Sequence, residues 1–129
     1  INNEQDPDQF IKDCRLSFEQ GNNLIIFPEG TRTTPQESLS FKRGASNIAI
    51  RANADFLPVL IYVNPVTLTK GLPWYKVPDK KFTFRLLVQP PISVQKYANS
   101  DSVTNTVRQV TRELLDYYNK ELKIHERVN

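Results

Sequence analysis

The sequence predicts an α/β protein whose mixed sheet contains a βαβ unit and is flanked by helices. Three observations lead to this class. Two short apolar runs rich in β-branched residues, 24–27 and 57–63, are typical of buried strands. The segment between them carries alanine and isoleucine at helical spacing, and strands joined through one helix are almost always parallel. A third run, 82–88, alternates apolar and polar residues, which indicates a strand with one buried face.

Helices are expected on both sides of these strands. Asp6 can cap a first helix, and apolar residues then recur at helical spacing until Gly21 ends it. A second helix is predicted over 45–52 by small residues that allow close packing. A long amphipathic helix is predicted from Val103 to Leu122, with one apolar stripe. Residues 64–81 are expected to form a connection that contains proline and lysine.

Composition is that of an ordinary globular domain. The chain has 129 residues, of which 39% are hydrophobic and 24% charged, with a formal net charge of +3. We expect residues 1–129 to form a single partial domain. Lysine and arginine are spread along the chain, so no nucleic-acid partner is expected. A basic nucleic-acid binder is therefore a weaker hypothesis than the two developed below, an enzyme and a non-catalytic binding module. The one cysteine, Cys14, cannot build a disulfide framework or a thiolate cluster, and no metal site is expected.

Residues 27–32, with the sequence FPEGTR, carry the main chemical signal. Gly30 allows a sharp turn and a close approach of the backbone to a ligand. Arg32 offers a planar fork of donors that matches phosphate or carboxylate. Glu29 can orient a nearby cation, and Thr31 adds a hydroxyl. The segment follows a predicted strand, and ligands of open α/β sheets bind beyond the carboxyl ends of strands.

Two further cations, Lys42 and Arg43, stand directly before the second predicted helix. Helix N-termini favour anions, because free backbone N–H groups point outward there and the helix dipole is positive. We expect Arg32, Lys42 and Arg43 to converge on one phosphate. The alternative is that Arg32 is an ordinary loop arginine paired with Glu29, and that Lys42 and Arg43 are solvated residues at the start of a helix. The residues alone thus favour a phosphorylated or otherwise anionic ligand at the head of the βαβ unit.

Three blocks of this sequence resemble those of the glycerophospholipid acyltransferases. FPEGTR resembles the signature block, FKRGA at 41–45 the block that follows it, and FLPVLI at 56–61 the last block. They occur in the family's order, and the resemblance implies the C-terminal half of the glycerol-phosphate acyltransferase fold. It also implies transfer of a fatty acyl group from acyl-coenzyme A or acyl carrier protein to 1-acyl-glycerol-3-phosphate, giving phosphatidic acid, with no further cofactor. Pro58 matches the block linked to the acyl donor.

The resemblance assigns roles residue by residue. Residues 29–32 belong to the block that binds the acceptor, with Arg32 on its phosphate. Lys42 and Arg43 match a basic stretch that supports anion binding. The resemblance further implies a lysophospholipid acceptor, an acyl donor, and a place at the cytoplasmic face of the cell membrane.

The family's general base is missing from this chain. That base is a histidine in an H-x-x-x-x-D motif upstream of FPEGTR, and no histidine precedes Phe27 here. The single histidine, His125, lies near the C-terminus with no aspartate after it. We therefore expect the motif, with the N-terminal half of the domain, to lie outside these residues, so that this portion alone is inactive. The alternative is a non-catalytic module that binds phosphate or anionic lipid.

Two features of the sequence predict contacts of the protein surface with a membrane or with a second copy of the chain. Trp74 and Tyr75 lie among several lysines, a combination that suits a membrane interface. The alternative is that they cover the sheet edge while the lysines keep the loop soluble. We also expect self-association, because an incomplete sheet exposes an edge or an apolar face.

Overall fold

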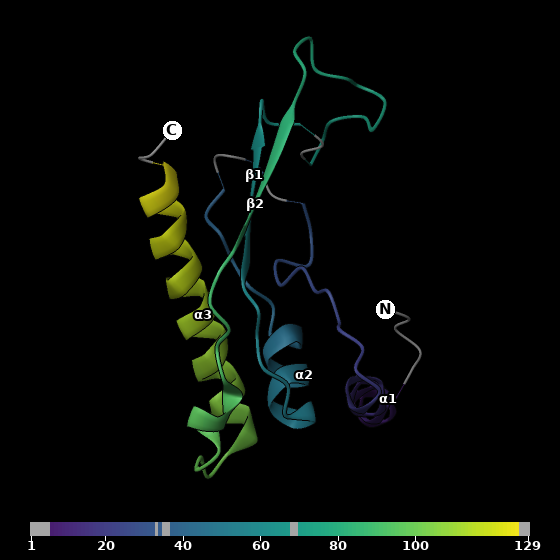
Figure 1. Ribbon diagram of the computed structural model, residues 1–129, viewed down its shortest axis with the longest axis vertical. Coiled ribbons are helices and arrows are strands. Elements are labelled where there is room, and N and C mark those ends of the chain that lie inside the picture. Colours follow the sequence, from purple (N-terminus) through teal and green to yellow (C-terminus); the bar gives the residue numbers. More distant parts are fainter. Residues whose placement is uncertain (1–5, 33, 35–36, 68–69, 127–129) are drawn as a thin grey trace.

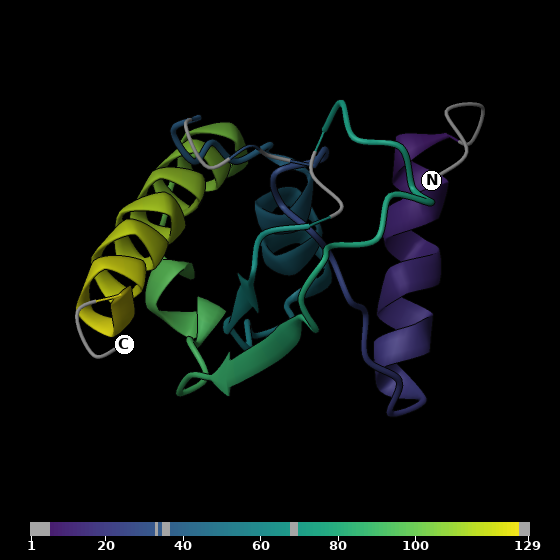
Figure 2. The same ribbon diagram turned by 90° about the horizontal axis from the view of Figure 1, so that it is seen from above.

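The computed structural model describes residues 6–32, 34, 37–67 and 70–126, without the side chains of His125 and Glu126. In chain order its elements are α1 (Pro7–Glu19), α2 (Gly44–Ala52), β1 (Val59–Asn64), β2 (Thr83–Val88), the 3-10 helix η1 (Val94–Tyr97) and α3 (Val103–Glu126). Figures 1 and 2 show α2 between the other two α-helices, with the two strands running beside α3. Among the described helices, none combines the length and the apolar character that crossing a bilayer requires.

The three predicted helices are confirmed. Asp6 caps α1, since its carboxylate accepts the backbone N–H of Asp8 at 3.1 Å. The chain turns away after α1 through Gly21, whose φ of +83° suits glycine. Asn53 ends α2 in the left-handed conformation, which asparagine tolerates well.

The packing of α2 on both of its neighbours forms the interior. Ile11 and Cys14 of α1 are buried against Ile48 of α2. On the other side, α2 packs against α3, where Ser46 and Thr111 join their hydroxyls at 2.9 Å. This arrangement leaves the N-terminus of α2 near the loop that precedes it.

The strands predicted over 57–63 and 82–88 are formed, and they pair with each other. β1 and β2 make an antiparallel ribbon whose register runs from Val59 opposite Val88 to Asn64 opposite Thr83. Residues 65–82 are the connection between them. An antiparallel pair needs only a hairpin, whereas a parallel pair needs a crossover.

The prediction of a βαβ unit is wrong for the described part of the chain. Residues 24–27 form no strand there, and the sheet has two strands, β1 and β2. Ile25 is 83% exposed, so this run is not buried either. An apolar run becomes a strand only beside a partner. Residues 24–27 have none, because among the described residues β1 and β2 pair only with each other. The coarser class holds: the chain combines α-helices with a small sheet.

Hydrogen bonds tie α3 to the ribbon and to the residue that follows it. The Tyr62 hydroxyl donates to the carbonyl of Leu122 at 3.4 Å, and Tyr117 bonds the side chain of Gln89 at 3.4 Å. Leu60 lies on the same ribbon face as Tyr62 and is 1% exposed. One face of the ribbon is therefore covered by the helical part of the molecule.

The opposite ribbon face is entirely apolar. Residues directly opposite in an antiparallel pair share a face, and the register groups six apolar side chains on this one. We call it the open ribbon face, and its members are Val59, Ile61, Val63, Phe84, Leu86 and Val88. Four of them are exposed, with Leu86 at 61%.

Candidate functional site

FPEGTR forms a tight turn. The N–H of Gly30 donates to the carbonyl of Phe27 at 3.1 Å, and Gly30 has φ +69°. In that region of backbone space a side chain is unfavourable, so glycine suits the position. The sharp turn expected at Gly30 is thus present.

A backbone hydrogen bond joins this turn to the second block. The N–H of Lys42 donates to the carbonyl of Pro28 at 2.7 Å. The side chain of Lys42 also crosses Gly30: a Cβ added there would meet Cγ of Lys42 at 3.1 Å and its Cε at 3.7 Å. The missing side chain at position 30 therefore makes room for the lysine stem, and one cation is held against the turn.

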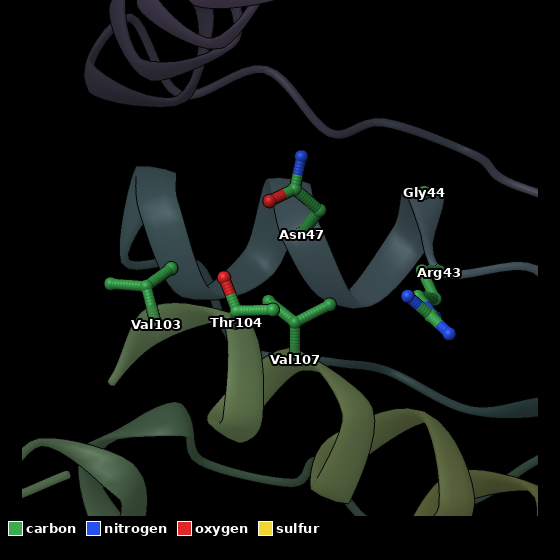
Figure 3. Close-up of a pocket in the computed structure, with 6 residues that line it drawn as sticks. All are labelled: Arg43, Gly44, Asn47, Val103, Thr104 and Val107. Atoms are coloured by element: carbon green, nitrogen blue, oxygen red, sulfur yellow. The ribbon is translucent and has the colours of Figure 1, made fainter. Parts of the chain in front are cut away.

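The other two predicted cations are exposed. Arg32 follows the turn, and Arg43 directly precedes α2 without a side-chain cap bond. Figure 3 shows Arg43 at one end of a shallow pocket of about 300 Å³ between α2 and α3, whose lining also includes Gly44, Asn47, Val103, Thr104 and Val107. Among the described residues, Arg32, Lys42 and Arg43 form no ion pair. Their convergence on one phosphate stays a prediction.

Glu29 is half-buried, and this burial raises the pKa of its carboxyl. Within the described ranges no ion pair joins Glu29 to a cation, so the orienting role expected for it is not seen. The charge of Glu29 acts instead on Tyr118 of α3. Burial raises the pKa of the Tyr118 hydroxyl, and the charge of Glu29 adds to that shift.

Tyr118 contacts the second and third of the three blocks that resemble the acyltransferases. Its ring meets Phe41 of the second edge-to-face, with centroids 5.3 Å apart. Its hydroxyl oxygen accepts the N–H of Val59, in the third block, at 3.2 Å. Thr31 is exposed beside the turn, with no contact among the described residues that assigns it a role.

Tyr118 was missed as a site residue: the sequence analysis predicted the last helix and its apolar stripe, with no site role for any residue of that helix. One signal for it exists in the sequence. A tyrosine on the buried side of a helix must find a partner for its hydroxyl, so it marks a place where another element's backbone approaches.

Pro58 is buried, and its carbonyl accepts the N–H of Gln89 at 2.9 Å, so it supports the ribbon.

The described residues contain no group of histidine, cysteine, aspartate and glutamate that could hold a metal ion. Cys14 is buried against α2, and burial raises the pKa of its thiol, which fits a packing role. His125 lies within α3, but its side chain is outside the part of the chain that the structure describes.

Comparison with known proteins decides the family. Residues 2–65, which contain all three blocks, match the family model described as Acyltransferase. The chain belongs to the acyltransferase family. It is 28% identical over 99 residues to a 1-acyl-sn-glycerol-3-phosphate acyltransferase alpha of Mus musculus, covering 69% of this chain and 32% of the relative. It is 27% identical over 96 residues to a 1-acyl-sn-glycerol-3-phosphate acyltransferase of Limnanthes douglasii, covering 74% and 32%.

A shorter match is more similar. Over 48 residues the chain is 42% identical to a putative 1-acyl-sn-glycerol-3-phosphate acyltransferase of Caenorhabditis elegans, covering 36% of this chain and 17% of the relative. No solved structure matches the chain. This acyltransferase chain thus spans about a third of the length of the first two relatives.

Proposed function

We propose that this chain forms the acceptor-binding part of a 1-acyl-glycerol-3-phosphate acyltransferase. The complete protein would move a fatty acyl group from acyl-coenzyme A or acyl carrier protein to 1-acyl-glycerol-3-phosphate, giving phosphatidic acid. The names of the relatives and the three ordered blocks support this proposal. We place this reaction at the cytoplasmic face of the cell membrane.

The observation that carries the proposal is the 2.7 Å hydrogen bond from Lys42 to Pro28. It holds the two cation-bearing blocks against each other, with Lys42 crossing Gly30. No ion pair among the described residues neutralises the cations of either block. Cations that stand on two blocks held together and that are left unpaired are suited to binding an anion.

Each cation contributes in a different way. The guanidinium of Arg32 can donate two parallel hydrogen bonds to phosphate oxygens, whereas the ammonium of Lys42 acts as a point charge. Binding the phosphate at one place positions the free hydroxyl of the acceptor for reaction. The hydroxyl oxygen attacks the thioester carbonyl, the thiolate leaves, and the hydroxyl proton passes to the histidine of the family motif in the complete protein.

The test is the substitution Arg32→Ala in the complete protein. A lost charge-assisted bond costs about 1.5–3 kcal/mol, so the KM for 1-acyl-glycerol-3-phosphate should rise about tenfold or more. Arg32→Lys, which keeps the charge and loses the fork, should give a smaller rise. The matched control is Arg112→Ala, at an exposed arginine of α3, which should leave KM unchanged.

An unchanged KM in Arg32→Ala would remove this arginine from the acceptor site. If the complete protein binds 1-acyl-glycerol-3-phosphate but transfers no acyl group, the non-catalytic module is the correct alternative.

A further inference from the structure

The connection between β1 and β2 extends beyond the ends of both strands, at the end of the molecule far from α1 and α2 (Figure 1). We call its described part, residues 70–82, the ribbon tip. Its side chains are predominantly exposed, and it contains both large apolar groups and charges.

The apolar groups of the ribbon tip project into solvent. Trp74 is 81% exposed, Tyr75 68% and Val77 75%. The rings of Trp74 and Tyr75 meet edge-to-face with centroids 6.0 Å apart, so they form one aromatic cluster. The alternative prediction, that these two rings cover the sheet edge, is therefore wrong. Clustered apolar side chains this exposed mark a contact surface.

The charges of the ribbon tip have one dominant sign. The ribbon tip contains four lysines and one acidic residue, Asp79, and all five side chains are exposed. The lysines flank the aromatic cluster on both sides in the sequence, at Lys70, Lys76, Lys80 and Lys81. Within the described ranges, none of them forms an ion pair. Their partner is therefore expected to be external and anionic.

We propose that the ribbon tip contacts the surface of a bilayer that contains anionic phospholipid. Trp74 and Tyr75 enter the interface, where amphipathic rings are favoured, and the lysines lie over the head groups, where the surface potential is negative. Phe82 links the apolar side chains of the ribbon tip to the open ribbon face, because its ring meets that of Phe84 edge-to-face with centroids 5.3 Å apart. The inference rests on the proposed function in one respect, since the acceptor of that reaction is itself a membrane lipid.

Trp74 allows a direct measurement, because it is the only tryptophan in the chain. The fluorescence of the full 129-residue chain is recorded with vesicles of phosphatidylcholine alone and with vesicles that also contain phosphatidylglycerol. We expect a blue shift with the anionic vesicles, quenching by brominated acyl chains, and reversal at high salt. A spectrum that stays unchanged with anionic vesicles, while circular dichroism shows a folded chain, overturns the proposal.

Substitutions assign the binding to the ribbon tip. Lys76→Gln should weaken sedimentation with anionic vesicles about fivefold, as expected for one lysine near a charged surface. Lys12→Gln, at an exposed lysine of α1, is the matched control and should change it little. Tyr75→Ser should also weaken binding, and Leu16→Ser on α1 should not. Equal losses in the tip variants and the controls would show general charge attraction and overturn the proposal.

These measurements need no acyl donor and no turnover, so they are separate from the test of the proposed function. In the complete protein, Lys76→Gln should keep acyl transfer to a short-chain acceptor that dissolves as monomers. If vesicle binding fails while the Arg32→Ala result holds, only the membrane contact is wrong.

Discussion

Glu29 shows how a single residue of the site acts against stability. Its carboxyl is half-buried, and burial raises its pKa above the ordinary value. A carboxyl with a raised pKa holds its proton more tightly in the folded chain than in the unfolded one. The free energy of unfolding therefore falls as pH rises through the pKa of the folded state. This loss is absent below the ordinary pKa, where the carboxyl is protonated in both states.

We expect Glu29→Gln to increase the free energy of unfolding at neutral pH, because glutamine keeps the shape and removes the poorly solvated charge. The gain should disappear below the ordinary carboxyl pKa. Denaturant unfolding at both pH values measures it, with Glu19→Gln on the exposed face of α1 as the control. A loss of stability at neutral pH would show instead that the carboxylate makes a favourable ion pair.

At the scale of elements, α3 joins the second and third sequence blocks through one side chain. Tyr118 packs its ring on Phe41 and accepts a hydrogen bond from Val59. The blocks are separated along the chain, and the helix gives them a shared surface. Its N-terminal half packs on α2 while its C-terminal half follows the ribbon, as Figure 1 shows.

Tyr118→Phe tests this role. The ring is kept and the hydroxyl is lost, so the N–H of Val59 loses its acceptor at a cost of about 1 kcal/mol. Denaturant unfolding should show that loss, and hydrogen exchange should be faster at the Val59 amide. Tyr117→Phe removes only the longer contact to Gln89, 3.4 Å, and should cost less. Equal losses of stability in the two variants would show that the hydrogen bond between Val59 and Tyr118 contributes no more than the one between Tyr117 and Gln89.

For the molecule as a whole, the open ribbon face leaves apolar side chains outside the core. Its six apolar side chains lie on the side of the ribbon opposite Leu60, and four of them are exposed. Water contact with such a face is unfavourable, and a second copy can remove it.

We therefore predict that the 129-residue chain self-associates as its concentration rises. Sedimentation equilibrium measures this directly. Leu86→Lys should shift the chain toward monomer, because it places a charge in the centre of the face. Leu16→Lys, at a similarly exposed leucine of α1, should not. A single monomeric species over the whole concentration range would contradict the prediction.

Much of the local structure could be predicted from the sequence. The helices were found because apolar residues recur at helical spacing and because Asp6 and Gly21 mark the ends of the first one. The turn at Gly30 was found because proline and glycine punctuate the chain. The strands at 59–64 and 83–88 were found from β-branched residues and alternation. The family was found from three short blocks whose order survives modest overall identity.

Pairing and proximity were decided only by the tertiary structure. The run 24–27 has the composition of a strand and lacks a partner, whereas β1 and β2 pair with each other. Tyr118 meets Phe41 and Val59 across long stretches of chain, which no local pattern records. Helical spacing, alternation and turn residues act over a few neighbours, so one sequence window contains them. A strand's partner, or the amide that bonds a distant tyrosine hydroxyl, depends on which distant surfaces meet when the chain packs.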